Sequence, residues 1–338
     1  MCSLFSQNAA STCRRRGLTM IRSYGRLCIL LLFMLTIGLI LSSCTSVSRD
    51  AVSTIASPQT ETAQSRAAET DITAAKAAKG SEPRVYTAEE LEGYPQDIRD
   101  ILSRGKLRIG LKVEDRYPFF YTDEEGLLRG SDVELANDIA LKLGVKPEYI
   151  RTADSFDEVI DQVSSGEVDV GISKLSITLE RAKRVLFSNA YLHFKQALLI
   201  NRLQLAELGK KNKFPDVLTL LQQRGTQIGI VQGTSYVGFT RELFPTQNQI
   251  AYKNTSELFD RVRQGEVIAA VYDAFEISRY LDQNPAYSLD LQYVQLEDQD
   301  DDIAIAVDPR RMHLHQWINT YLHMQEKKIQ RWLENYGI

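Results

Sequence analysis

Two stretches of this chain, at an offset of 260 − 161 = 99 residues, carry nearly the same pattern. Residues 161–174 read DQVSSGEVDVGISK and residues 260–273 read DRVRQGEVIAAVYD, which share the frame D-x-V-x-x-G-E-V. Each copy predicts a short amphipathic helix that ends at a glycine, followed by a buried strand. A chain that builds this unit twice is predicted to have two similar α/β lobes. Open α/β sheets bind ligands beyond the carboxyl ends of their strands, so we expect the polar residues after each strand to face a ligand.

The rest of the folded part alternates between strand and helix patterns. Ser131–Glu134 and Ser155–Glu158 each have the form of a capping box at the start of a helix. This alternation predicts parallel strands joined by right-handed crossovers. Strands are predicted at residues 107–111, 148–151, 168–172, 196–200, 227–231 and 303–307, and helix from residue 312 to the C-terminus, with Trp317, Tyr321 and Trp332 as packing residues.

These elements predict two lobes joined by two crossings. The first lobe is expected at residues 95–199, the second at 200–293, and residues 294–338 are expected to return to the first. The crossings are predicted near residues 196–202 and 293–302. A cleft between two lobes is the default position for a ligand site.

The N-terminal region has the pattern of an export signal. Arg22 and Arg26 precede an apolar run at residues 27–41. That run is shorter than the roughly 20 residues of a membrane-spanning helix and is typical of a signal peptide. The following Leu-Ser-Ser-Cys, which ends at Cys44, resembles the lipobox of bacterial lipoproteins.

The lipobox resemblance implies that residues 1–43 are a signal peptide and that Cys44 carries lipid, such as palmitate, which anchors the protein to a membrane. An uncleaved signal anchor is the alternative, and Met20 is an alternative start. Residues 44–94 are expected to form the lipidated cysteine and a flexible tether, because few large apolar residues are present to build a core.

Composition excludes several functions. The net charge of −4 gives no electrostatic basis for nucleic-acid binding. All four cysteines lie at or before Cys44, so the folded part has no disulfide and no thiol nucleophile. No metal site is expected, since His313 and His315 are only two residues apart. The sequence also has no phosphate loop and no dinucleotide fingerprint, so no cofactor is expected. The acidic run at residues 297–302 is expected to be a solvated loop, with calcium conceivable there.

Five segments together resemble bacterial extracellular solute-binding proteins of family 3, the polar amino-acid receptors of ABC transporters. The most specific segment begins SKLSITLER at Ser173 and ends in Phe187-Ser188. The other four are LRIGL at 107–111, GSDVELANDIA at 130–140, GIVQGTSY at 229–236 and AAVYD at 269–273.

The family resemblance covers residues 95–338 and implies an α/β fold of the periplasmic-binding-protein-like type II, with two hinge crossings and a ligand cleft. It implies a monomer without enzymatic activity that captures a free amino acid and then docks on an ABC permease in the inner membrane. The location implied is the periplasm, or the extracytoplasmic face of a bacterial membrane.

The two charges of an amino acid suggest two site residues. A guanidinium binds a carboxylate bidentately, which suits Arg181, and Thr178 is placed to cap the short helix that carries it. Asp273 follows the second repeat strand and suits the ammonium, or caps the next helix. The resemblance adds Ser176 and Ser235 as further ligand contacts.

The side-chain pocket is less sharply defined by the sequence. The family places an aromatic residue after the first strand, for which Tyr117 and Phe119 are both candidates, with core packing as the other role of Phe119. Lys174 departs from the family, where a small residue is common. By the repeat offset it is the counterpart of Asp273. We hypothesise that its ammonium reaches into the cleft and favours an acidic ligand; alternatively, it points to solvent.

Two other functions are compatible with this sequence. Cyclohexadienyl dehydratases share the fold and need a general acid in the cleft, for which Glu114 is a candidate. A sensory receptor that signals to a partner is the other alternative, because a long tether permits it.

Overall fold

The computed structural model of the chain describes residues 84–210 and 216–338, all within a compact unit that spans Asp71–Ile338. The signal peptide, Cys44 and most of the tether predicted from the sequence lie outside the described residues. The tether was predicted to extend to residue 94, but the described chain already forms a helix, α2, at Ala88–Glu92.

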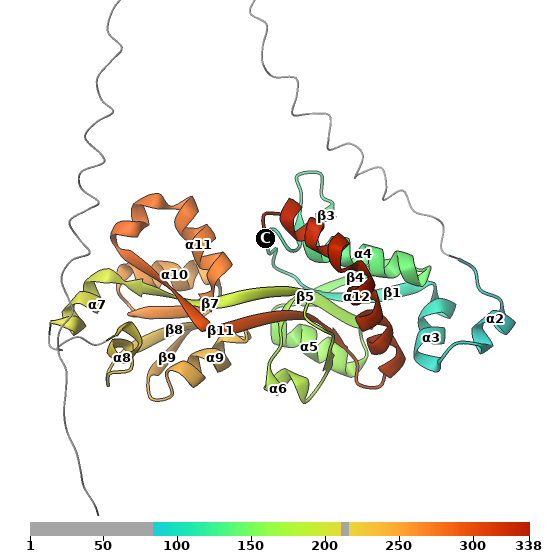
Figure 1. Cartoon of the computed structure of the whole chain (residues 1–338), viewed down its shortest axis with the longest axis horizontal. Coiled ribbons are helices and arrows are strands. Elements are labelled where there is room, and N and C mark those ends of the chain that lie inside the picture. Colours follow the sequence, from blue (N-terminus) through green and yellow to red (C-terminus); the bar gives the residue numbers. More distant parts are fainter. Residues whose placement is uncertain (1–83, 211–215) are drawn as a thin grey trace, which may run out of the picture. The chain divides into compact units, whose positions relative to one another are not determined.

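One large mixed sheet organises the described residues, and helices cover both of its faces (Figure 1). Its strand order is β4-β1-β5-β11-β7-β10-β8-β9, with β6 paired to β11. The strands are β1 (Lys106–Lys112), β4 (Lys146–Ala153), β5 (Val170–Ser176), β6 (Leu186–Phe187), β7 (Leu192–Asn201), β8 (Gln227–Val231), β9 (Asn248–Tyr252), β10 (Ala269–Asp273) and β11 (Leu291–Val307), with β2 (Tyr121–Thr122) and β3 (Leu128–Arg129) in a separate hairpin.

The sheet contains two parallel halves. β4, β1 and β5 pair in parallel in the first half, and β9, β8 and β10 do so in the second. β7 and β11 lie between the halves and pair antiparallel to each other. β11 also pairs antiparallel with β5, and β7 with β10. The predicted crossings are thus the two central strands, and the predicted two-lobed α/β architecture with parallel strands is confirmed.

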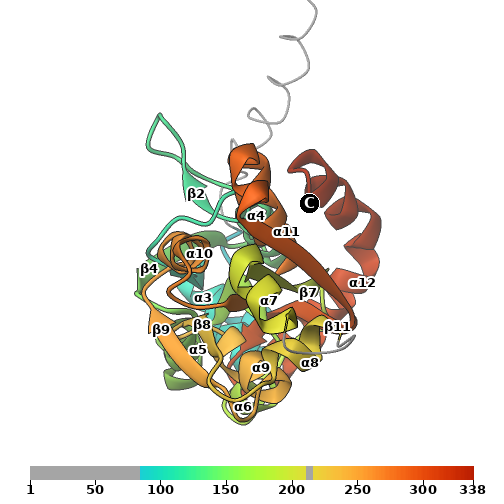
Figure 2. The same ribbon diagram turned by 90° about the vertical axis from the view of Figure 1, so that its left-hand side faces the viewer.

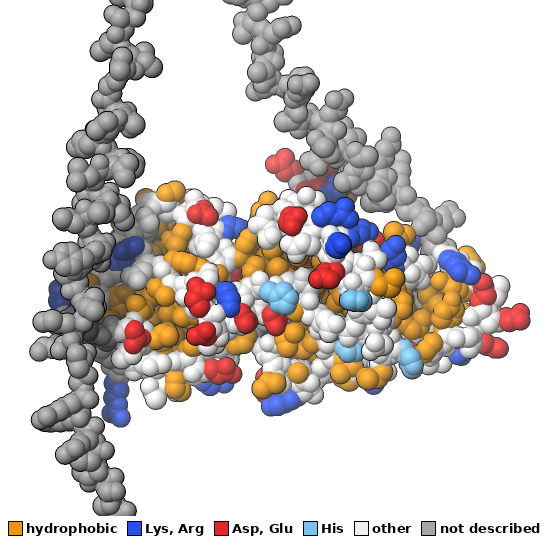
Figure 3. All heavy atoms as spheres, viewed as in Figure 1, with side chains coloured by type: hydrophobic (Ala, Val, Ile, Leu, Met, Phe, Trp, Pro, Cys, Tyr) orange, Lys and Arg blue, Asp and Glu red, His pale blue; other side chains and the backbone are white. Residues whose placement is uncertain are grey.

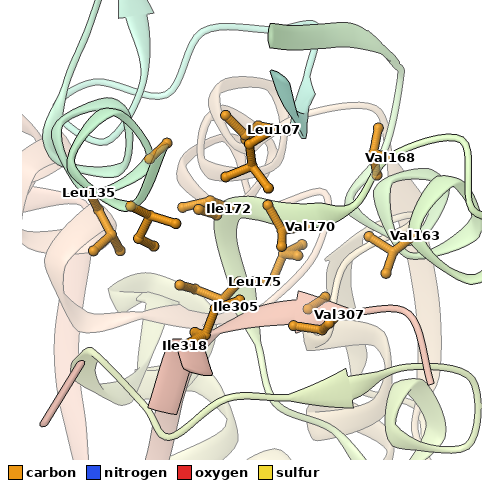
Figure 4. Close-up of a cluster of buried hydrophobic side chains, with 14 of the residues drawn as sticks. Leu107, Leu135, Val163, Val168, Val170, Ile172, Leu175, Ile305, Val307 and Ile318 are labelled. Atoms are coloured by element: carbon orange, nitrogen blue, oxygen red, sulfur yellow. The ribbon is translucent and has the colours of Figure 1, made fainter. Parts of the chain in front are cut away.

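Each lobe has its own buried apolar cluster. Figure 4 shows part of the first, in which side chains from β1, β5 and β11 meet those of α4, α5 and α12. The second cluster gathers side chains of β7, β8 and β10 with those of α10. In Figures 1 and 2, α9 and α10 lie on opposite faces of the strands of the second lobe. The helices are α3 (Gln96–Arg104), α4 (Ser131–Leu143), α5 (Phe156–Ser165), α6 (Leu179–Ala182), α7 (Arg202–Gly209), α8 (Val217–Leu221), α9 (Tyr236–Leu243), α10 (Thr255–Gln264), α11 (Ala274–Gln283), the 3-10 helix η1 (Pro285–Leu289) and α12 (Met312–Asn335).

The internal repeat is present in three dimensions. α5 ends at Gly166 with φ 82° and leads to β5, while α10 ends at Gly265 with φ 78° and leads to β10. Side chains at equivalent positions begin the two helices, because Ser155 and Asn254 each accept a hydrogen bond from the backbone three residues on. The prediction of two helix–glycine–strand units is confirmed, and the α12 prediction holds with Tyr321 buried in the first core.

Two local predictions were wrong at the starts of helices. α4 begins at Ser131 itself, with Gly130 as the N-cap and no side-chain cap hydrogen bond. Ser131 is already helical, and the N-cap position before it has to be a glycine, because a Cβ atom on Gly130, which has φ 124°, would lie 2.2 Å from the backbone oxygen of Phe119. At α5 only half of the predicted capping box forms, since the Glu158 side chain accepts from the amide of Asp154 instead of Ser155.

The acidic run at residues 297–302 is not the predicted loop. It lies inside β11, where Asp300 and Asp302 pair with Lys195 and His193 of β7. Asp301, between them, is almost fully buried. Alternation along a strand places neighbouring residues on opposite faces, which explains why one acid in the run is buried while others are exposed.

Surface chemistry adds little that is distinctive. On the face shown in Figure 3, acidic, basic and hydrophobic side chains are interspersed, with no extended patch of one sign. No helix among residues 84–210 and 216–338 is long and apolar enough to cross a membrane. Within the same residues, no group of three or more His, Cys, Asp or Glu side chains is arranged to hold a metal ion.

Candidate functional site

The carboxyl ends of the two repeat strands meet between the lobes. Lys174 near the end of β5 and Asp273 at the end of β10 form a direct ion pair, with 2.7 Å between Nζ and Oδ2. Both side chains are buried, at 7% and 0% exposure. The two positions that correspond in the repeat are therefore partners across the cleft.

Asp273 also begins the helix that follows it. Its Oδ1 accepts a hydrogen bond from the backbone amide of Glu276 at 2.8 Å, which caps α11. One carboxylate oxygen thus satisfies the helix N-terminus, while the other accepts from the Lys174 ammonium. The predicted helix cap at Asp273 is confirmed, and the oxygen that was predicted to bind a ligand's ammonium is here bound by Lys174.

Lys174 is held in an unusual backbone conformation. Its φ of 49° lies in the left-handed region, which costs a residue with a side chain roughly 1–2 kcal/mol. Its amide donates to Oδ2 of Asp132 at 2.7 Å, and Oδ1 of Asp132 accepts from the Tyr191 hydroxyl at 2.8 Å. Burial raises the pKa of Asp132 to about 6, although both hydrogen bonds favour the ionised form.

The Lys174 ammonium lies over two neighbouring aromatic rings. Nζ is 5.1 Å from the ring centre of Phe119 and 5.2 Å from that of Phe194. Burial by itself would lower the pKa of Lys174, but the carboxylates of Asp273 and Glu276 raise it further than burial lowers it. The ammonium is therefore charged, paired with a carboxylate and flanked by ring faces that attract cations.

Arg181 projects from the short helix α6 into the same region. The Thr178 side chain accepts from the Arg181 amide at 3.1 Å, which is the predicted cap. Nε and Nη2 of Arg181 donate to Oδ1 of Asp157 at 3.0 and 2.8 Å, and Nη1 donates to the backbone oxygen of Ser176 at 3.1 Å. Asp157 is 48% exposed, so the guanidinium is buried but its acidic partner reaches solvent.

A hydroxyl contact joins the lobes beside Arg181. Ser235, just before α9, donates from Oγ to Oγ of Ser176 at 2.9 Å. A small pocket with a volume of about 10 Å³ adjoins this contact. The residues that line it are Phe156, Lys174, Ser176, Arg181, Thr234, Ser235, Tyr236 and Tyr272.

The structure therefore brings together four of the seven predicted ligand-binding residues as pocket lining and places a fifth, Asp273, directly behind Lys174. The aromatic walls Phe156, Tyr236 and Tyr272 were not predicted. Phe156 follows the helix cap Ser155, Tyr236 follows Ser235 and Tyr272 precedes Asp273. Their position next to predicted residues is the sequence feature that could have identified them.

The two aromatic candidates after β1 do not line the pocket. Tyr117 is 52% exposed, and its backbone oxygen accepts from Arg279. Phe119 is fully buried and packs edge-to-face against Phe194 and Phe275, at ring distances of 5.9 and 5.6 Å. Phe119 contacts the site through the Lys174 ammonium, which lies over its ring, and its backbone oxygen accepts from the amide of Asp132 at 2.9 Å.

Two further acids lie behind the pocket. Burial raises the pKa of Glu276, and the neighbouring Asp273 carboxylate raises it further. Burial also raises the pKa of Asp301, whose Oδ2 accepts from the Tyr236 hydroxyl at 2.5 Å. Glu114, the candidate general acid, is 45% exposed and contacts Lys112 and Arg116.

Two α/β lobes joined by two central strands, with a buried guanidinium and hydroxyl groups between them, define the class of binding proteins that hold a small solute between lobes. The sequence pattern of bacterial extracellular solute-binding proteins, family 3, matches residues 107–336. The chain belongs to that family, and its fold is the predicted periplasmic-binding-protein type II.

Similar proteins are named as amino-acid-binding proteins. The chain is 26% identical over 191 residues to the glutamine-binding protein of Geobacillus stearothermophilus, covering 56% of this chain and 69% of that protein. It is 28% identical over 177 residues to the L-cystine-binding protein TcyJ of Escherichia coli (strain K12), covering 52% and 62%. These alignments thus span about two thirds of the relatives' own lengths.

Solved structures agree with the fold. An ancestral arginine-binding protein bound to arginine has 30% identity and a TM-score of 0.56, covering 69% of this chain and 98% of that one. An ancestral amino-acid-binding protein, described as a precursor of cyclohexadienyl dehydratase, has 25% identity and a TM-score of 0.57, covering 71% and 98%.

Proposed function

We propose that this protein is the solute receptor of an ABC importer and captures a polar solute of the amino-acid class between its lobes. The observation that carries the proposal is the buried Arg181 guanidinium in the wall of a pocket to which both lobes contribute. Receptors of this kind take up the ligand by moving one lobe against the other. The closed form then docks on a membrane permease.

Arg181 is proposed to bind the ligand's carboxylate. Its planar fork matches a carboxylate, and the Asp157 carboxylate that it now contacts is half exposed, so a ligand can replace Asp157 at modest cost. The hydroxyls of Ser176 and Ser235 stand beside the guanidinium and are proposed as further donors. Neither Tyr117 nor Phe119 is proposed as a direct contact.

An amino-acid ligand would place its α-ammonium at Asp273, and Lys174 would then have to leave that carboxylate. An acidic amino acid offers an exchange that conserves charge, because its side-chain carboxylate can take Lys174 while its ammonium takes Asp273. That exchange is the physical basis for proposing an acidic amino acid as one candidate ligand.

Binding without catalysis is the role we propose. The relatives named above are binding proteins, and Glu114 faces two cations instead of the pocket. A dehydratase remains the second candidate because one structural neighbour is described as a precursor of such an enzyme. Turnover of prephenate or arogenate by the purified protein would favour the enzyme.

The cellular setting proposed is extracytoplasmic. The family is extracellular by description, and the signal peptide and the lipid on Cys44 that the sequence predicts would tether a monomer to the membrane near its permease. Mass spectrometry of the mature N-terminus tests the lipid. A peptide that continues through Cys44 without cleavage or modification would contradict it.

Thermal-shift screening of the protein against the twenty amino acids and small carboxylates derived from them tests the receptor function. A ligand present at 100 times its Kd should stabilise the fold by about 2.7 kcal/mol. Arg181→Ala should weaken binding of the hit by at least tenfold, since a charge-assisted hydrogen bond contributes about 1.5–3 kcal/mol. Arg184→Ala is the matched control, because Arg184 pairs with Asp161 on the surface. No hit at millimolar concentrations, or equal losses in both variants, would contradict the proposal.

A further inference from the structure

The pocket wall presents cations but no anion. Its charged lining residues are Lys174 and Arg181, and the other lining side chains are aromatic or carry hydroxyls. Among the described residues that line the pocket, none is an acid. A zwitterionic amino acid needs an anion for its ammonium, and the buried Asp273 that would serve is behind Lys174.

Both oxygens of Asp273 are already engaged. Oδ1 accepts from the Glu276 amide and Oδ2 from the Lys174 ammonium. A ligand ammonium that approached Asp273 would have to break one of these contacts. Breaking the first uncaps α11, and breaking the second moves Lys174.

Lys174 is poorly placed to move. Its ammonium lies against the rings of Phe119 and Phe194, and these rings pack on each other at 5.9 Å. Its backbone is fixed by Asp132, which the Tyr191 hydroxyl holds in turn. A carboxylate and two ring faces form the kind of enclosure that binds a ligand's ammonium, and a side chain of the protein fills it.

We propose that Lys174 stands in for the ligand's α-ammonium, so that this site selects small carboxylates without one: the 2-oxo and 2-hydroxy acids that correspond to amino acids. This inference rests on the proposed receptor function, in which Arg181 takes the carboxylate. It chooses between the ligand classes considered there, because a ligand without an ammonium leaves the pair of Lys174 and Asp273 intact, whereas an acidic amino acid has to break it. Lys174, Ser176 and Ser235 line the same pocket as Arg181 and carry hydrogen-bond donors that a 2-oxo or 2-hydroxy group can use. Phe156 and Tyr272 supply aromatic walls for the remainder of the ligand.

Calorimetric titration of the full chain, purified in detergent, with matched ligand pairs tests the inference. The pairs are glutamate with 2-oxoglutarate, aspartate with malate, and phenylalanine with phenyllactate, each sharing a side chain and differing at the 2-position. We expect the deaminated member of the bound pair to bind about tenfold tighter, the ratio produced by one charge-assisted hydrogen bond. An amino acid that binds as tightly as its deaminated partner, or more tightly, would overturn the inference and leave the receptor function standing.

Two variants test the role of Lys174 itself. Lys174→Met should shift the preference of the bound pair toward the amino acid by tenfold or more, because it frees Asp273. Since that variant leaves a buried carboxylate without its partner, the double variant Lys174→Met with Asp273→Asn serves where the single one does not fold. The double variant should lose the discrimination, and a wild-type preference retained in either variant would refute the role of Lys174. Failure of every ligand to bind the wild type would instead contradict the receptor function.

Discussion

Oδ2 of Asp132, on α4, accepts the backbone amide of Lys174 at 2.7 Å and so fixes the strained end of β5. Asp132 is fully buried, and among the residues that the structure describes its carboxylate accepts from the Lys174 amide and the Tyr191 hydroxyl, neither of which is a cation. Lys174 can therefore direct its ammonium toward Asp273 only while a buried carboxyl group restrains its backbone.

The first prediction concerns this carboxyl group and pH. Burial raises the pKa of Asp132 from 3.8 to about 6 in the folded protein, so the folded state holds its proton more tightly than the unfolded chain does. Its contribution to stability is therefore most favourable below about pH 4 and declines by roughly 3 kcal/mol as the pH rises through 6. Urea unfolding between pH 4 and 7.5 should show that the wild type loses stability relative to Asp132→Asn as the pH rises.

Asp123 is the internal control for that experiment. A hydrogen bond from Arg129 holds the pKa of Asp123 below its ordinary value, so its contribution is present above that value and is lost as the pH falls. Asp123→Asn should therefore leave the pH dependence nearly unchanged between pH 4 and 7.5, and a change of the opposite sense should appear only below about pH 4. The same slope for both variants would contradict the assignment.

A second prediction concerns the buried pair of Tyr236 and Asp301. Tyr236→Phe removes the hydroxyl that donates to Oδ2 of Asp301 at 2.5 Å and should cost about 1–3 kcal/mol. Burial already raises the pKa of Asp301, so the loss should be larger at pH 8 than at pH 5, where more of the acid is protonated. Tyr293→Phe, which removes an exposed contact with Gln295, should cost less than about 0.5 kcal/mol at both pH values.

A third prediction concerns the start of α4. Gly130→Ala would place a Cβ atom 2.2 Å from the Phe119 backbone oxygen, and backbone atoms there cannot move aside without disturbing the core. We expect a loss of about 4 kcal/mol or more in the free energy of unfolding. Gly126→Ala also has positive φ but meets nothing within 4 Å, so it should cost only about 1–2 kcal/mol. Equal losses would show that backbone conformation, and not the steric contact, decides the effect.

A fourth prediction uses the repeat as its own comparison. Gly166 and Gly265 end equivalent helices at φ 82° and 78°, and a Cβ atom would lie 3.0 Å from Arg310 in one case and 3.1 Å from Gln204 in the other. Both neighbours are ends of flexible side chains. Gly166→Ala and Gly265→Ala should therefore each lower stability by about 1–2 kcal/mol, within error of one another in chemical denaturation. A difference above about 2 kcal/mol would show that the two copies are not equivalent in the folded protein.

Periodicity and the repeat were sufficient to predict the lobes. The apolar patterns of β1, β8 and α12 are local, and glycines at 166 and 265 mark helix ends by their own conformational freedom. The start of α4 could not be predicted in this way, because Gly130 is required by Phe119, a contact between separate segments. For the same reason, the burial of Asp301 depends on the pairing of β11 with β7.

The sequence was sufficient to predict the polar residues of the site. It was not sufficient to predict which side chains contact one another there. Arg181 and Asp273 stand out because each charge follows a strand. The ion pair between Lys174 and Asp273 depends on the distance between the two lobes, and this distance cannot be read from the sequence. Phe119 is apolar and follows β1, so the sequence could not distinguish a ligand cover from the core position that it occupies.

The two connections between the lobes are neighbouring strands of one sheet. Movement of one lobe against the other has to bend β7 and β11 together, because the two strands are hydrogen-bonded to each other. They therefore cannot act as two independent hinges. The ladder between these strands shifts register between Gln295 and Asp300, where bending disturbs the fewest backbone hydrogen bonds. The energy needed to separate the lobes therefore depends partly on the few residues at this register shift. These residues lie at some distance from the groups proposed to bind the solute.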